Sequence, residues 1–301
     1  MMSETGYYHM YANGDDAKNF VLCERDILSA FNRVGVCAAN CNAKVVSFSI
    51  EDTHPHILLY GSQEDCLVFK QKYESSTKHY IVSNRGSIDD VVFDCDLDFI
   101  DDNEHLKNVG TYTISQPTKD GKPVMPYDYL YGTGALYFRS SRVVLPWLVA
   151  SDGSVSQPQR LASFCRKQQK AILSSRSEVP EDWLVCNGFL LPTNYVDISL
   201  FEKIYVTHNC FRAFLCSGKQ RDQAVHERMA KVHGISMEDM EARRICSELC
   251  LRLFGMNNPR GLDVRQRLTV AQSLRTQYYL PFRQVASVVR LPESEIRKYV
   301  R

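Results

Sequence analysis

The segment 45–50 (VVSFSI) restricts the fold of this chain more than any other feature of its sequence. Its β-branched and apolar residues alternate with Ser47 and Ser49, which is the pattern of a half-buried strand. A second strand is predicted over 56–60 (HILLY), and a third, rich in tyrosine, over 7–12. These strands are separated by stretches of helical periodicity, so the sequence predicts an α+β fold for this part of the chain.

The remainder of the chain is predicted to be mainly helical. Apolar residues at near-helical spacing predict helices over 18–33, 64–80, 101–115, 157–175, 222–255 and in the last forty residues. Residues 119–134 are too rich in proline and glycine for regular structure, and 255–261 (GMNNPRG) have the composition of a linker. We therefore expect three parts: residues 1–138, a mostly helical region 139–258 without an assigned role, and residues 259–301.

Composition excludes several classes of protein. With 44% hydrophobic and 24% charged residues among 301, the chain is typical of a globular protein and not of a disordered one. No apolar run has membrane-spanning length, and the N-terminus (MMSETGYYHM) lacks the regions of a signal peptide, so a cytoplasmic location is expected. The eleven cysteines, an odd number without zinc-finger spacing, are expected to be reduced.

Charge is distributed unevenly along the chain. Residues 221–301 carry 15 Lys/Arg against 9 Asp/Glu, a net of +6, whereas residues 1–220 have a net of −5. A basic C-terminal part suggests an anionic partner, although a solvated helical surface would give the same count.

The tripeptide His54-Pro55-His56 is a candidate metal site. On an extended segment, residues two apart point to the same side, so the two imidazoles can share one divalent cation. Two ordinary surface or core histidines remain the alternative, because a pair of histidines at this spacing is a weak motif by itself.

Tyr112 and Gln116 form a second candidate pair. If this segment is helical, residues four apart share one face, and a phenol beside an amide that completes a metal site suits phosphoryl transfer. The alternative is a tyrosine packed at the end of a core helix that Pro117 terminates.

Several segments of residues 6–138 occur in a characteristic order: Tyr8-His9 on the first predicted strand, the segment 53–59 (THPHILL), Tyr112 after an acid-rich stretch, Pro117, and the segment 125–129 (MPYDY). In this order they resemble the HUH single-strand nucleases, specifically the single-tyrosine transposases and their REP-associated relatives. The combination is far more specific than any one of its motifs.

The resemblance implies a ferredoxin-like nuclease domain with an antiparallel sheet, and it implies roles for individual residues. Tyr112 would be the nucleophile that forms a 5′-phosphotyrosine and releases a 3′-hydroxyl. His54, His56 and Gln116 would hold Mg²⁺ or Mn²⁺. The sequence departs from the family in two places: Thr53 stands where the family has asparagine, and Gln116 where the REP-associated branch has asparagine.

The last forty residues resemble a helix-turn-helix. Pro281 favours the start of a helix that runs through Val289, and a break at 290–292 precedes a second short helix over 293–299. Nine basic and three acidic residues lie between positions 260 and 301, which fits contact with phosphates. The candidate DNA-binding residues are Arg283, Arg297, Lys298 and Arg301. A small helical bundle that packs on the rest of the enzyme is the alternative.

The resulting hypothesis is a transposase that cleaves and rejoins single-stranded or hairpin DNA. It involves no membrane, and a homodimer is left open. Two alternatives remain: a domesticated regulator that binds DNA without cutting it, and a metal-dependent phosphoesterase for small molecules in which Tyr112 is only structural.

Overall fold

The computed structural model describes residues 5–12, 19–86, 93–119, 125–140, 143–175, 177–232, 237 and 239–300, with the side chains of a few of them left out. By its internal contacts the chain divides into two compact units, Met1–Arg221 and Asp222–Arg301. Each unit is described by itself.

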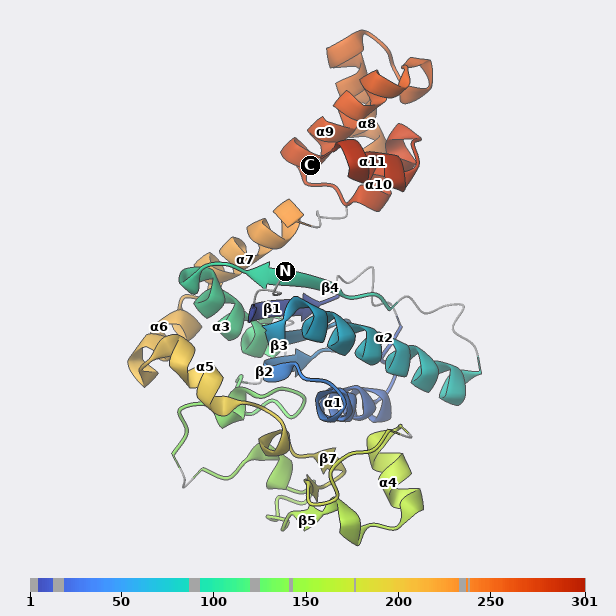
Figure 1. Ribbon diagram of the computed structural model, residues 1–301. Helices are drawn as coiled ribbons and strands as arrows, with labels where there is room; N and C mark the ends of the chain where they lie inside the picture. Colours follow the sequence, from blue (N-terminus) through green and yellow to red (C-terminus); the bar gives the residue numbers. More distant parts are fainter. Residues whose placement is uncertain are drawn as a thin grey trace. The chain divides into compact units, whose positions relative to one another are not determined.

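The first unit is built on a four-stranded antiparallel sheet (Figure 1). The strands lie in the order β2-β3-β1-β4, and their bounds are Thr5–Tyr11 for β1, Lys44–Ile50 for β2, Pro55–Ser62 for β3 and Asp96–Ile100 for β4. The α+β prediction is confirmed, and the three predicted strands are present within two residues at each end. Strand β4 was not predicted, since its acidic residues were interpreted as a solvated run.

Three helices cover the two faces of this sheet. They are α1 (Glu24–Ala39), α2 (Gln63–Arg85) and α3 (Asn103–Lys119), and the chain order is β1-α1-β2-β3-α2-β4-α3. On one face Phe31 of α1 packs against Phe48 of β2, with ring centroids 5.1 Å apart. On the other face Tyr112 of α3 lies against His56 of β3. The sheet is therefore the middle layer of three.

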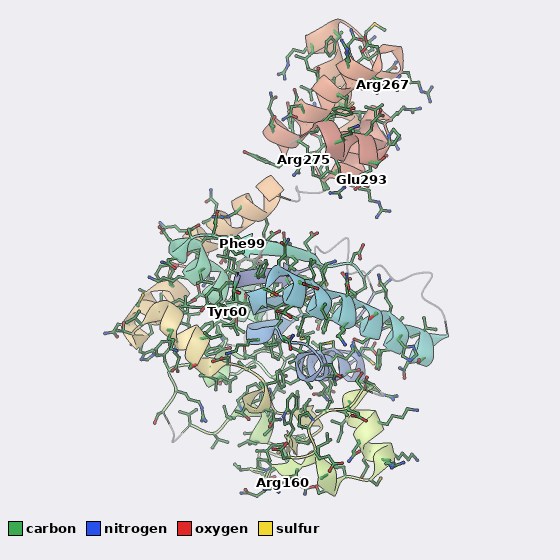
Figure 2. All side chains as sticks on the ribbon, in the orientation of Figure 1. Tyr60, Phe99, Arg160, Arg267, Arg275 and Glu293 are labelled. Atoms are coloured by element: carbon green, nitrogen blue, oxygen red, sulfur yellow. The ribbon has the colours of Figure 1, made fainter. Side chains whose placement is uncertain are left out.

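The antiparallel register assigns each side chain to a face. Phe48 is opposite Ile57, and Ile57 is opposite Met10, so all three point toward α1 and α2. His9 is one residue from Met10 and must point the other way, toward α3. Strand β4 follows the same rule on its outer edge, where Phe99 (labelled in Figure 2) packs its ring 5.2 Å from that of Tyr8.

A β-bulge interrupts β2. Val45 pairs with Leu59, but the next pair is Ser47 with Leu58, so Val46 is an extra residue in this strand. The carbonyl of Val46 accepts a hydrogen bond of 2.7 Å from Tyr137 Oη. After the bulge Phe48 faces the apolar layer, whereas Ser47 and Ser49 face α3.

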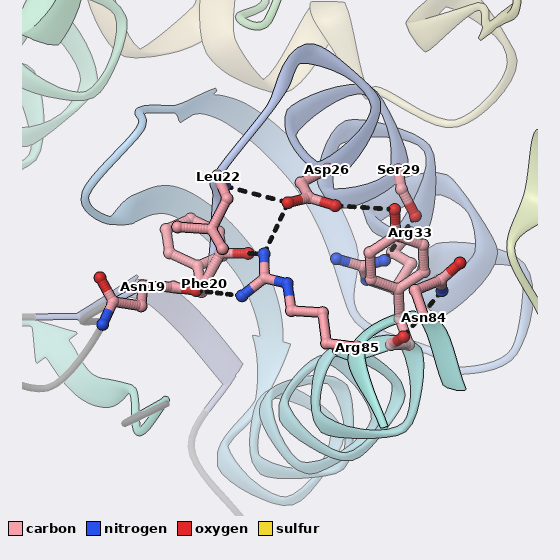
Figure 3. A network of polar contacts seen from close by, with 9 residues as sticks. Asn19, Phe20, Leu22, Asp26, Ser29, Arg33, Asn84 and Arg85 are labelled. Carbon is pink, nitrogen blue, oxygen red and sulfur yellow. Dashed lines mark hydrogen bonds and ion pairs between the residues drawn. The ribbon is translucent and has the colours of Figure 1, made fainter. Parts of the chain in front are cut away.

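A partly buried ionic network joins the start of α1 to the end of α2 (Figure 3). Asp26 Oδ2 accepts hydrogen bonds from the Leu22 amide at 2.9 Å and from Arg85 at 2.5 Å, and its Oδ1 accepts one from Tyr80 Oη at 2.9 Å. Arg85 also donates to the carbonyl oxygens of Asn19 and Phe20. Burial alone would raise the pKa of Asp26, but these donors outweigh it and lower the pKa below its ordinary value.

Helix α3 is held from outside by α5 (Ile198–Tyr205). Tyr205 Oη donates a hydrogen bond of 2.7 Å to the carbonyl of Lys107. The approach requires Gly110, because a Cβ at that position would lie 2.5 Å from Tyr205 Oη. Neither α5 nor α6 (His208–Cys216) was predicted, because the preceding proline and tryptophan residues indicated irregular structure.

The remainder of the first unit contains a small second sheet and short turns. Its strands, in the order β5-β6-β7, are Gln159–Arg160, Leu184–Cys186 and Phe189–Leu190, and α4 spans Arg166–Leu173. Turns of 3₁₀ helix occur at Gly134–Leu136, Pro146–Leu148, Leu161–Ser163 and Pro192–Asn194. The predicted helix over 157–175 is thus wrong in its first half, which contains β5.

The second unit is helical throughout the part of it that the structure describes. Helix α7 (Gly218–Val232) runs into it, and α8 (Asp239–Phe254), the 3₁₀ turn Pro259–Gly261, α9 (Val264–Tyr278), α10 (Phe282–Val289) and α11 (Glu293–Tyr299) follow. One apolar core joins α8 to α11, and it includes Ile245, Leu249, Leu274, Val285 and Ile296. The division of the chain at 221/222 coincides with neither expected boundary, 138/139 or 258/259, because α8 shares its core with the last three helices.

None of the helices in the described ranges is both long and apolar enough to span a membrane.

Candidate active site

His54 and His56 lie where the chain returns from β2 into β3. The Glu51 amide donates a hydrogen bond of 3.0 Å to the His54 carbonyl, which closes the tight connection between the strands. The two imidazole rings point to the same side, with centroids 4.7 Å apart and planes at 80°. His56 is 1% exposed, whereas His54 is partly exposed. The structure thus brings the predicted pair together at the rim of the buried sheet face.

Tyr112 faces this pair from α3. Its ring centroid is 5.2 Å from that of His56 and 6.2 Å from that of His9, nearly perpendicular to both. The side chain is only 3% exposed. The predicted nucleophile and the predicted metal-binding pair therefore adjoin one another, although they are 56 residues apart in the sequence.

Gln116 follows Tyr112 by one helical turn, as the sequence predicted, and its side chain is 4% exposed. Its amide nitrogen has no hydrogen-bond partner among the residues that the structure describes. A buried amide with an unsatisfied atom costs stability unless something else completes its environment.

Helix α3 contains residues of low helical propensity, and their hydroxyl groups are satisfied within the helix. Thr111, Thr113 and Ser115 donate to the carbonyl oxygens four residues earlier, at 2.9, 2.8 and 2.6 Å. The helix continues beyond Pro117 to Lys119, so the expectation that Pro117 would end it is wrong by two residues.

Three further side chains share this face of the sheet, and none of them was predicted as a site residue. His9 and Tyr11 of β1 alternate with the apolar Met10, and Asp98 of β4 lies opposite His9. Tyr11 Oη donates a hydrogen bond of 2.9 Å to Asp98 Oδ2, and burial together with this carboxylate raises the pKa of Tyr11. The period-two pattern in 7–11 and in 94–98 could have indicated them.

The chemistry of the donors fits a divalent cation in part. Two imidazoles on one side could supply nitrogen ligands and the Gln116 carbonyl an oxygen ligand, a set that suits Mn²⁺ better than Mg²⁺. The unsatisfied atom of Gln116 is an N–H donor, and a cation would not satisfy it. Within the described ranges, no three or more His, Cys, Asp and Glu side chains are grouped to hold a metal ion. The predicted ligands are two histidines and one glutamine, so they do not make a group of this composition. Metal binding by His54, His56 and Gln116 therefore stays a prediction.

The four predicted DNA-binding residues lie at the end of the second unit. Arg283 and Lys298 are exposed. Arg297 forms a salt bridge of 2.6 Å with Glu293. The guanidinium of Arg297 lies 4.8 Å from the ring centroid of Phe282, and the guanidinium of Arg275 lies 4.4 Å from the same centroid. Figure 2 labels Arg275 and Glu293 in this unit. Arg301 lies outside the described residues.

Comparison with known protein families, with curated proteins and with solved structures found no match to this chain.

Proposed function

We propose that this protein is a transposase that cuts and rejoins single-stranded DNA through a 5′-phosphotyrosine, in the manner of the HUH single-tyrosine enzymes. One observation carries the proposal: the rings of His54, His56 and Tyr112 form a contiguous group, with centroids 4.7 and 5.2 Å apart. Two imidazoles beside a phenol are the groups that metal-assisted attack of tyrosine on a phosphodiester needs.

The topology supports the proposal. A β-α-β-β-α-β chain order with the spatial order β2-β3-β1-β4 is that of ferredoxin-like domains. We therefore propose a ferredoxin-like domain, the fold that the sequence resemblance implies. In this arrangement β1 and β3 are the two inner strands, so His9 and His56 lie on inner strands, on the face that α3 covers.

The proposed reaction is an exchange of phosphodiester bonds. The Tyr112 oxygen forms a bond to phosphorus while the bond from phosphorus to the 3′ oxygen breaks, and the proton lost by the phenol is balanced by the one that the 3′-hydroxyl gains. The energy of the phosphodiester is kept in the tyrosine ester, so a second 3′-hydroxyl can reverse the step and join a new strand. A Mg²⁺ or Mn²⁺ ion held by His54, His56 and Gln116 would polarise a phosphate oxygen.

The second unit supports a DNA partner. Helices α10 and α11 are joined by a short turn at Arg290, which has a φ of 59° and takes the left-handed position that a glycine often occupies in such turns. The short turn supports our proposal of a helix-turn-helix, in which Arg283, Arg297 and Lys298 would contact the phosphates of a hairpin stem.

The test is the capture of a covalent adduct. Wild-type protein and Tyr112→Phe are incubated with Mn²⁺ and a library of hairpin-bearing single strands labelled at the 3′ end, because the tyrosine would retain the downstream fragment. Wild type should give a labelled band on a denaturing gel that mass spectrometry assigns to Tyr112, and Tyr112→Phe should give none. Tyr8→Phe, which removes a phenol oxygen from the opposite face of the sheet, is the control and should still form the adduct.

A regulator that binds DNA without cutting it is the second candidate, and the burial of Tyr112 favours it. A side chain that is 3% exposed has to become accessible before it can attack a phosphate. Sequence-specific DNA binding without any adduct, in wild type and Tyr112→Phe alike, would establish this candidate in place of the first.

A further inference from the structure

A second buried histidine, His9, contacts His56 directly. The ring atoms His9 Nε2 and His56 Nδ1 are 3.1 Å apart, a hydrogen-bond distance, and the two rings are stacked with centroids 5.2 Å apart. His9 is 2% exposed and His56 1% exposed. Such a bond in the sheet interior fixes both rings, because no water competes for it.

The aromatic ring of Tyr11 also packs against His9. The ring of Tyr11, the next residue on the same face of β1, lies 4.7 Å from His9 and 6.1 Å from His56. Tyr11 is itself anchored by its hydrogen bond to Asp98. The row from Asp98 through Tyr11 to His9 and His56 therefore crosses β4, β1 and β3 on one face.

The hydrogen bond determines which nitrogen of His56 is available. A neutral imidazole has one protonated nitrogen and one with a lone pair. If Nδ1 of His56 carries the proton and donates it to His9, the lone pair is at Nε2. If His9 donates instead, Nε2 of His56 carries the proton and cannot bind a cation.

We propose that His9 is a positioning residue for the metal site: its Nε2 accepts the proton of His56 Nδ1 and so leaves the Nε2 lone pair of His56 for the cation. This inference rests on the proposed function, and it extends the site from strand β3 to strand β1. Metal-binding histidines in proteins are generally oriented by an acceptor at their second nitrogen, and loss of that acceptor weakens metal binding by about 10–100-fold.

The proposal predicts different outcomes for substitutions of His9 that keep a hydrogen-bond acceptor and for those that remove it. Gln has a carbonyl oxygen at about the reach of His9 Nε2, so His9→Gln can still accept the proton. His9→Leu fills similar space without an acceptor. His79→Leu, a substitution of an exposed histidine on α2, is the matched control.

The experiment measures Mn²⁺ binding by calorimetry and adduct formation on full-length protein. We expect the dissociation constant for Mn²⁺ to rise about 10–100-fold in His9→Leu and to stay close to the wild-type value in His9→Gln and His79→Leu. Adduct formation at saturating Mn²⁺ should be close to wild type in His9→Gln. In Mg²⁺-loaded wild type, long-range ¹H–¹⁵N spectra should show the proton of His56 on Nδ1, a result that does not depend on any variant folding.

Three results would overturn this inference without affecting the proposed function. The first is wild-type Mn²⁺ affinity in folded His9→Leu, and the second is a protonated Nε2 on His9 in the Mg²⁺-loaded protein. The third is loss of the adduct in His9→Gln at unchanged Mn²⁺ affinity, which would indicate that His9 acts directly on Tyr112. Absence of both Mn²⁺ binding and adduct in wild type would overturn the proposed function as well.

Discussion

His54 and His56 are two residues apart and are held in different ways. The Nδ1 atom of His54 is 2.6 Å from Thr53 Oγ1, a hydroxyl on an exposed residue, whereas that of His56 is bonded to the buried His9. Both of these contacts are therefore made by the Nδ1 side of the ring. His54, His56 and Tyr112 could be named as candidates from the sequence, because the spacing of two residues and the order of the motifs are read directly along the chain. The partner of His56 could not be named, because the pairing of β1 with β3 brings together residues 47 apart.

We expect alanine substitutions of the three proposed ligands to separate metal binding from stability. His54→Ala should abolish Mn²⁺-dependent adduct formation without lowering the melting temperature, because its ring is partly exposed. His56→Ala should also lower the free energy of unfolding by about 1–3 kcal/mol, since it leaves His9 without its bonding partner. Gln116→Ala should weaken Mn²⁺ binding less than either. Calorimetry and thermal unfolding measure both effects, and unchanged Mn²⁺ binding in His54→Ala would contradict the site.

The helices and strands differ in how much of each was visible in the sequence. Strands β2 and β3 have clear apolar patterns, so both were found almost to the residue. Strand β4 was missed because Asp96 and Asp98 belong to a long acidic run, although they alternate with Leu97 and Phe99 as strand residues do. Helices α5 and α6 owe their stability to packing against α3, as the Tyr205–Lys107 bond illustrates, and local periodicity carries little of that information.

The network around Asp26 makes the attachment of α1 to α2 depend on pH. Because the pKa of Asp26 is lower in the folded protein than in the unfolded chain, its contribution is complete above the unfolded pKa of about 3.9. It is lost as the pH falls through the lower, folded pKa. Asp26→Asn should therefore lower the free energy of unfolding by about 1.5–3 kcal/mol at neutral pH.

Urea unfolding from pH 7 to pH 2 provides the measurement. The gap between wild type and Asp26→Asn should narrow as the pH falls below about 4. Glu64→Gln is a suitable control, because this carboxylate is exposed in the first turn of α2 and makes none of the bonds of the Asp26 network. A gap that stays constant down to pH 2 would rule out the ionised carboxylate as its source.

At the scale of the whole molecule, the chain divides into its two units at a place that its charge does not mark. The second unit, from Asp222, is basic, but residues 105–220 also carry more Lys/Arg than Asp/Glu, 13 against 8, so the basic excess extends across the boundary. The expected boundary at 258/259 followed the linker-like composition of 255–261, but that segment forms the short turn between two helices of one core. Composition indicates where a chain bends, and only the apolar contacts across the bend show whether a domain ends there.

We expect the exposed cations of α10 and α11 to contribute to the salt dependence of DNA binding. Arg283→Ala with Lys298→Ala should weaken binding of a hairpin and reduce the slope of log affinity against log salt by about 0.9 for each phosphate contact removed. Arg243→Ala with Arg244→Ala removes the same charge from α8, where Arg244 already pairs with Glu241 and Glu248, and should change the slope less. If the slope of log affinity against log salt were the same in the two double variants, the change would come from net charge alone and not from contacts made by α10 and α11.

A chain that lost Val46 would keep both faces of β2, since the strand would simply become regular and Ser47 would follow Val45 in the ladder. Its main loss would be the carbonyl that accepts the Tyr137 hydroxyl. A chain that lost Leu58 from the neighbouring strand would turn His56 and His54 to the opposite side of the sheet. Two adjacent strands thus differ in the changes of length that they can accept: loss of the extra residue keeps the faces of β2, whereas β3 is fixed in length from Pro55 onward by the side on which His56 must emerge.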